Sequence, residues 1–187
     1  SLCVRILRRD IERIGYNRSF VIYDTQDQLS LIKECIKECG LREDSFKPSS
    51  VLSAISGAKD KLLNPKAFEA RYFNDFRLSK ISKVYDLYQR KLKSNNALDF
   101  DDLIFKTVEL LKTDEFVRDF YQRKFQYVMV DEYQDTNHAQ YVLINLLSEM
   151  HKNLCVVGDD DQSIYGWRGA DIANILDFEK DYKDAFV

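Results

Sequence analysis

The sequence predicts an α/β protein in which a parallel sheet with helices on its faces is interrupted by a mostly helical insertion. Two observations predict the sheet. The β-branched apolar runs at 127–130 and 154–157 each end abruptly in polar residues rich in carboxylates, and the stretch between them is long enough for one crossover helix. A third observation, helical spacing and helix-start signals through residues 24–97, predicts the insertion.

The elements before the insertion follow from local patterns. A helix is expected over residues 1–15, because Leu2, Ile6, Leu7, Ile11 and Ile14 form an apolar stripe with arginines elsewhere on it. Residues 20–23 are expected to form a strand.

Within the insertion, each expected helix has its own start signal. Thr25 and Gln28 have the spacing of a capping box, and Gly40 is expected to end that helix. The next helices are expected to begin at Pro48 and at Pro65. An aromatic stripe at helical spacing then favours a bundle core over a base-stacking platform; it comprises Phe68, Tyr72, Phe73, Phe76, Tyr85 and Tyr88.

After the turn at Asn95 and Asn96, acidic residues precede a helix expected over 103–111. Asp99, Asp101 and Asp102 most simply cap that helix and receive no catalytic role. The predicted domains are therefore residues 1–23 and 98–187, forming the α/β part, and residues 24–97, forming the helical insertion.

Composition fits a folded chain of 187 residues, with 45% hydrophobic and 13% aromatic content. No apolar run is long enough to span a membrane and nothing resembles a signal peptide, so we expect a cytoplasmic protein. The four cysteines do not combine with the two histidines at metal-site spacing, and Cys35 and Cys39, which share a helix face, are expected to be reduced packing residues.

The net charge of −3 conceals an asymmetry. Residues 1–97 carry 19 Lys and Arg against 12 Asp and Glu, whereas residues 98–187 carry 9 against 19. The basic half suits contact with a phosphate backbone, although the same residues also fit ordinary solvated helix faces. The acidic half suits a magnesium site.

The carboxyl ends of adjacent parallel strands lie at one edge of a sheet, so Asp131, Glu132, Asp159 and Gln162 are expected to converge there. Asp131 suits magnesium, which is held by one or two carboxylates plus substrate phosphates. Glu132 suits a base that activates a water attacking a terminal phosphate. Gln162 has a donor and an acceptor and suits a phosphate sensor. The structural alternative is that Asp135, Thr136 and Asn137 only cap the helix expected over 139–150.

The second cluster runs into Tyr165, Gly166, Trp167 and Arg168. Aromatic faces beside a guanidinium stack unpaired bases without reading sequence. The alternative is that Trp167 merely plugs its loop onto the sheet.

At these residues the chain resembles superfamily 1 DNA helicases of the UvrD, Rep and PcrA type, and the PcrA type most closely. DEYQDTN (131–137) resembles motif II and GDDDQSIYGWRGAD (158–171) resembles motif III. Residues 1–15 resemble the end of motif Ib and its following helix, and ALDFDDLI (97–104) resembles motif Id.

The resemblance implies an incomplete RecA-like subdomain 1A, interrupted by a helical subdomain 1B, from an ATP-dependent 3′–5′ helicase. It implies that Asp131 joins magnesium coordination, Glu132 activates water, and Gln162 couples the ATP γ-phosphate to DNA. Tyr165, Trp167 and Arg168 would line the path of single-stranded DNA, with strand–duplex junctions as substrates and repair or replication proteins as partners.

The sequence has no G-x-x-x-x-G-K-[ST] loop to cradle phosphates, and the family's later motifs are also missing. We therefore expect a middle piece of a helicase that does not hydrolyse ATP alone. Two other classes remain open: a metal-dependent nuclease or phosphohydrolase that uses the carboxylates directly, and a non-enzymatic helicase-like module that binds DNA or protein.

Overall fold

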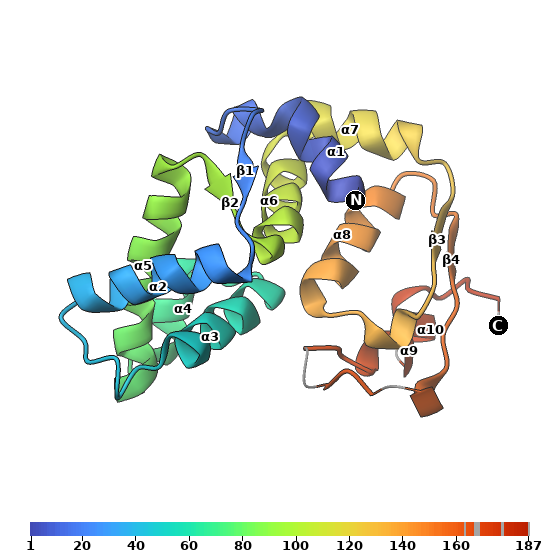
Figure 1. Cartoon of the computed structure of the whole chain (residues 1–187). Helices are drawn as coiled ribbons and strands as arrows, with labels where there is room; N and C mark the ends of the chain where they lie inside the picture. Colours follow the sequence, from blue (N-terminus) through green and yellow to red (C-terminus); the bar gives the residue numbers. More distant parts are fainter. Residues whose placement is uncertain (163, 167–168, 177, 187) are drawn as a thin grey trace. The chain divides into compact units, whose positions relative to one another are not determined.

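The computed structural model describes residues 1–162, 164–166, 169–176 and 178–186. The chain divides into two compact units, residues 1–107 and 108–187, each of which combines helices with a pair of short parallel strands (Figure 1). The mixed α/β class predicted from the sequence is confirmed.

The first unit holds most of the helices. Its elements are α1 (Leu2–Asp10), the short 3-10 helix η1 (Ile11–Ile14), β1 (Val21–Ile22), α2 (Thr25–Glu38), α3 (Pro48–Asp60), α4 (Pro65–Tyr72), α5 (Phe76–Ser94), β2 (Ala97–Leu98) and most of α6 (Phe100–Thr113). The helix starts predicted at Pro48 and Pro65 are confirmed, and proline at the first turn suits both because that position needs no N–H donor.

The start of α2 differs from the prediction by one residue. The capping box uses Asp24 and Asp27: the Asp24 carboxylate accepts from Asp27 N (2.9 Å), and the Asp27 carboxylate accepts from Asp24 N (3.1 Å). The predicted box of Thr25 and Gln28 is wrong, because the buried Gln28 instead donates to the Tyr23 carbonyl at 2.9 Å.

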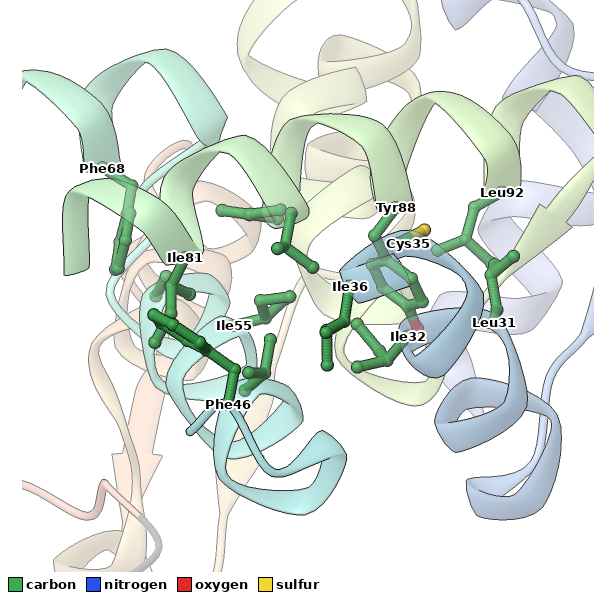
Figure 2. Close-up of a cluster of buried hydrophobic side chains, with 14 of the residues drawn as sticks. Leu31, Ile32, Cys35, Ile36, Phe46, Ile55, Phe68, Ile81, Tyr88 and Leu92 are labelled. Atoms are coloured by element: carbon green, nitrogen blue, oxygen red, sulfur yellow. The ribbon is translucent and has the colours of Figure 1, made fainter. Parts of the chain in front are cut away.

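The helices α2, α3, α4 and α5 pack around one apolar cluster (Figure 2). Phe68, Tyr85 and Tyr88 of the predicted stripe are buried in it, and Tyr72 packs at its margin. The stripe prediction is wrong for Phe73 and Phe76, which are 68% and 78% exposed. These two lie where α4 turns into α5, so the helical periodicity that placed them on the buried face is interrupted there.

The helical segment between β1 and β2 begins and ends at neighbouring strands. β1 pairs in parallel with β2, with Val21 opposite Ala97 and Ile22 opposite Leu98. β2 was not predicted, and it has only two residues. Among the described residues the strands form two separate pairs, instead of the single sheet expected.

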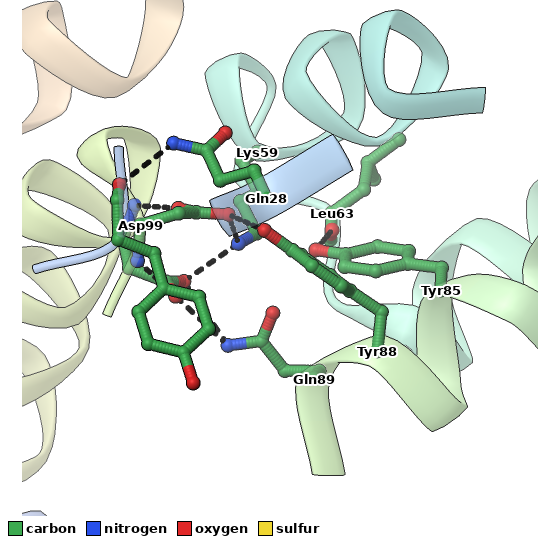
Figure 3. Close-up of polar contacts among 9 residues, drawn as sticks. Gln28, Lys59, Leu63, Tyr85, Tyr88, Gln89 and Asp99 are labelled. Carbon is green, nitrogen blue, oxygen red and sulfur yellow. Dashed lines mark hydrogen bonds and ion pairs between the residues drawn. The ribbon is translucent and has the colours of Figure 1, made fainter. Parts of the chain in front are cut away.

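Asp99 and Asp102 begin α6 as a reciprocal cap, as predicted. Asp102 N donates to Asp99 Oδ1 at 2.8 Å, and Asp99 N donates to Asp102 Oδ2 at 3.3 Å. The same carboxylates also hold the buried ammonium of Lys59, whose Nζ lies 2.6 Å from Asp99 Oδ2 and 2.9 Å from Asp102 Oδ1 (Figure 3). Tyr88 adds a hydroxyl that donates to Asp99 Oδ2 at 2.9 Å.

The second unit contains the predicted βαβ segment. It comprises the rest of α6, then α7 (Glu115–Lys124), β3 (Val128–Val130), η2 (Tyr133–Asp135), α8 (His138–Ser148), β4 (Leu154–Val156), η3 (Asp160–Gln162), α9 (Ala173–Leu176) and α10 (Phe178–Asp181). β3 and β4 pair in parallel with Val128 opposite Leu154. Asn137 and Gln140 form the capping box of α8, which confirms the capping predicted for Asn137, whereas Asp135 and Thr136 end the preceding η2.

All four cysteines are free thiols, including Cys35 and Cys39, for which this was predicted. Cys3 and Cys35 are buried, and burial raises the pKa of the Cys35 thiol to about 12. No helix among the described residues is long and apolar enough to cross a membrane.

Candidate functional site

The candidate site lies where β3 and β4 end. The pairing continues one residue beyond the strands, because Val157 N donates to Val130 O (2.8 Å) and Tyr133 N donates to Val157 O (2.9 Å). Asp131 and Glu132 therefore leave β3 at the same edge at which Gly158 and Asp159 leave β4. This is the convergence that the parallel pairing predicted.

Glu132 reverses the chain immediately after β3. Its backbone is left-handed, with φ 52° and ψ 42°, a conformation that costs a residue with a Cβ about 1–2 kcal/mol. The Asp131 carboxylate supports the turn by accepting from Glu132 N at 2.9 Å. Strained backbone of this kind is frequent at functional sites, and here it accompanies an exposed carboxylate.

Gln134 connects the two strand ends. Its side chain is buried, with the residue only 1% exposed. Its Nε2 donates to Glu132 Oε2 at 2.7 Å, and its Oε1 accepts from Asp159 N at 3.0 Å. Gly158 leaves room for this amide, since a Cβ at that position would lie 2.5 Å from Gln134 Oε1.

Gln162 is joined to the same series from the β4 side. Its Nε2 donates to Asp159 Oδ2 at 2.7 Å, and its backbone N donates to Asp159 O at 3.1 Å. Asp159 Oδ1 accepts from Asp161 N at 3.0 Å, so Asp159 also organises the turn of η3. A continuous series of hydrogen bonds thus links the predicted site residues through one further side chain, in the order Asp131, Glu132, Gln134, Asp159 and Gln162.

Of the residues predicted to contact DNA, the structure describes Tyr165, which is half-buried. Trp167 and Arg168 lie outside the described residues. The segment after them returns to the site, where Asp171 N donates to Thr136 O (2.9 Å) and Asn174 Nδ2 donates to Thr136 Oγ1 (3.1 Å).

Among the described residues, no three or more His, Cys, Asp or Glu side chains gather closely enough to hold a metal unaided. The exposed Asp131 carboxylate fits a different kind of site. A magnesium ion keeps several waters and is held by one or two carboxylates together with phosphate oxygens.

Comparison with known proteins identifies the family of the chain. Residues 1–183 match the family described as UvrD/REP helicase N-terminal domain. The chain belongs to this family.

The chain also resembles individual helicases of this family along its whole length. It is 57% identical over 187 residues to the ATP-dependent DNA helicase PcrA of Bacillus subtilis (strain 168), covering 100% of this chain and 25% of that protein. It is 54% identical over 185 residues to PcrA of Staphylococcus aureus (strain Mu50 / ATCC 700699), covering 99% of this chain and 25% of that protein. The chain therefore spans about a quarter of the length of the curated relatives it matches.

In this UvrD/REP helicase domain, sequence reasoning missed Gln134. A signal was present, because the residue is a glutamine between carboxylates in DEYQD, and its amide has the same donor and acceptor that drew attention to Gln162. What the sequence did not reveal was its burial against Gly158, which lies 24 residues further along the chain.

Proposed function

We propose that this chain is part of an ATP-dependent 3′–5′ DNA helicase or translocase that acts in DNA repair or replication. Such an enzyme couples ATP hydrolysis to movement along single-stranded DNA and opens strand–duplex junctions. The observation that carries the proposal is the hydrogen-bonded series between Glu132 at the end of β3 and Gln162 after β4. The PcrA relatives, which are named ATP-dependent DNA helicases, support the same activity.

The proposed roles follow from the position of each side chain. Asp131 would bind a magnesium ion, which on binding neutralises phosphate charge. Glu132 would orient the attacking water and accept its proton. Its link to the neutral amide of Gln134 leaves the carboxylate charge in place, which suits a base.

Gln162 would report the presence of the terminal phosphate. Its amide now donates to the Asp159 carboxylate, and a γ-phosphate oxygen is an acceptor of the same kind. Exchanging one anionic acceptor for the other lets Gln162 change position between the ATP-bound and product-bound states. The loop that follows would carry this change to DNA, with Tyr165, Trp167 and Arg168 along the strand.

We also propose the subdomain division of the family for this chain. Residues 24–97 would be the helical 1B insertion, and residues 1–23 and 98–187 would belong to the RecA-like subdomain 1A. The parallel pairing of β1 with β2 supports this division, because the helical segment begins and ends at adjacent strands, as an insertion between two elements of another subdomain requires.

The test uses the full-length protein that contains this segment. With magnesium and single-stranded DNA it should hydrolyse ATP, and it should unwind a duplex with a 3′ tail in preference to one with a 5′ tail. Because Glu132 is the proposed base, Glu132→Gln should lower kcat by about 10²–10⁴-fold. Full activity of this variant, or cleavage of DNA with metal and no ATP, would contradict the proposal.

The isolated 187-residue chain provides the complementary measurement. It lacks a G-x-x-x-x-G-K-[ST] loop, whose backbone amides and lysine hold the phosphates in P-loop enzymes. We therefore expect no ATP turnover above background from the chain alone. Sustained hydrolysis by the purified chain would show that the site does not depend on such a loop.

A further inference from the structure

We infer that Gln134 is a positioning residue that couples the proposed base, Glu132, to the proposed sensor, Gln162. The inference deepens the proposed function and rests on it. Gln134 would not touch ATP or water itself. It would act by holding Glu132 and by passing on the position of Asp159, to which Gln162 is bonded.

The orientation of the Gln134 amide is fixed by its partners. The backbone N–H of Asp159 can only donate, so the amide oxygen must face it. The amide nitrogen then faces Glu132 Oε2, which accepts at 2.7 Å. A rotated amide would place a donor against a donor and an acceptor against a carboxylate, and it would lose both bonds at once.

Burial makes this arrangement strict. Gln134 is 1% exposed, so water does not readily replace a lost partner, and an unpaired buried amide is unfavourable. Gly158 is part of the same device, because a Cβ there would lie 2.5 Å from Gln134 Oε1 and 2.7 Å from Ile175 Cδ1. Any side chain at residue 158 would therefore displace the amide from its place.

The coupling follows from how Asp159 is shared. Its backbone N–H donates to Gln134, while its Oδ2 accepts from Gln162. When Gln162 leaves Asp159 for a phosphate, the turn that contains Asp159 loses one of its restraints, and Gln134 transmits the resulting shift to Glu132. The orientation of the base would thus depend on whether the sensor is engaged.

The experiment measures DNA-stimulated ATP hydrolysis by the full-length protein. Gln134→Met keeps the length of the side chain and removes both hydrogen bonds. We expect kcat to fall by about 10–100-fold, the usual effect of losing a residue that orients a catalytic group, while KM for ATP changes by less than about threefold. Gly158→Ala should act in the same direction, because it displaces the same amide.

A double variant separates positioning through Glu132 from any other role. In the Glu132→Gln background, adding Gln134→Met should lower kcat by no more than about twofold, because the group through which Gln134 acts is already disabled. Multiplicative losses would overturn the inference, as would a Gln134→Met kcat within about twofold of wild type. If Glu132→Gln itself retains full activity, the proposed function fails instead, so the two failures are distinguishable.

The fraction of each variant that binds ATP separates positioning from misfolding. Gln134→Glu can still accept from Asp159 N, but it can no longer donate to Glu132. We expect its kcat to fall as in Gln134→Met, while the fraction of the protein that binds ATP stays that of wild type. A bound fraction that falls in proportion to kcat would indicate a purely structural role and overturn the inference.

Discussion

The buried ammonium of Lys59 gives a prediction whose size can be worked out from its contacts. Lys59 and both of its partners, Asp99 and Asp102, have side chains that are 0–1% exposed. Desolvation lowers the pKa of Lys59, but the carboxylates of Asp102 and Asp99 raise it by more, and the net direction is upward. The ammonium therefore stays charged in the folded protein.

Lys59→Met removes this cation and leaves both carboxylates buried without it. Removing one partner of a buried ion pair costs about 3–5 kcal/mol, because the remaining charge is uncompensated, and two carboxylates are left here. Domains of this size are stable by about 5–15 kcal/mol, so the loss is a large fraction of the total. With a urea m-value of about 2 kcal/mol per molar, the midpoint should fall by about 2 M.

The assay is urea unfolding of the 187-residue chain, followed by the helical circular dichroism signal. The matched control is Lys91→Met, which removes a lysine that pairs with Glu34 and Glu38 at the surface and should shift the midpoint far less. Since the folded pKa of Lys59 is raised, its contribution is complete below the unfolded lysine pKa and is lost only as the pH rises through the folded value. The effect of Lys59→Met should therefore persist up to about pH 9 and shrink toward acidic pH, where the stranded carboxylates take up protons.

A triple variant identifies the origin of the loss. Adding Asp99→Asn and Asp102→Asn to Lys59→Met removes the stranded charges. The triple variant should therefore regain most of the urea midpoint that Lys59→Met loses. No recovery would mean that the lysine stem, and not the charge, supports the fold. A Lys59→Met midpoint within about 0.5 M of wild type, at an unchanged m-value, would refute the reasoning altogether.

Three further predictions concern the same unit and the same unfolding assay. Burial, and then the charge of Asp101, raise the pKa of Asp60 to about 6, so ionised Asp60 disfavours folding above that pH. Asp60→Asn should therefore raise the free energy of unfolding by about 1 kcal/mol at pH 7.5, allowing for the partial exposure of the residue, and should leave it unchanged at pH 4. Asp24→Ala should lower the free energy of unfolding by about 1 kcal/mol because it removes the cap of α2, whereas Thr25→Ala should lower it much less. The reverse order of losses would support the capping box of Thr25 and Gln28 that the sequence predicted. Gly40→Ala should lower the free energy of unfolding by about 1 kcal/mol, because Gly40 has a φ of 69°, although nothing lies within 4 Å of its Cβ position. An unchanged urea midpoint would show that the turn relaxes.

Features encoded within a few residues were predictable from the sequence. The β3–α8–β4 segment, the proline starts of α3 and α4, and the convergence of acidic residues after two strands all follow from short-range patterns. The position of the α2 cap was missed by one residue because Asp24 and Thr25 are both good capping residues, and only the burial of Gln28 decides between them.

Features that depend on distant partners were not predictable. Lys59 resembles any lysine on an exposed helix until Asp99, 40 residues later, is brought beside it. β2 is too short to leave a periodic pattern and exists because β1 lies alongside it. The exposure of Phe73 and Phe76 was missed for a different reason: Asp75, the N-cap of α5, marks the break after α4 locally, and this signal was overlooked.

The chain has two acidic pairs whose roles differ because the side chains that contact them differ. Asp99–Asp102 and Asp131–Glu132 both follow a short strand. The first pair faces a buried ammonium, which compensates one of its two negative charges. The second pair is exposed, and Gln134 donates to Glu132 through a neutral amide that orients the carboxylate without cancelling its charge. An acidic pair that keeps its charge at the end of parallel strands can attract a cation from solvent, as the proposed magnesium role requires.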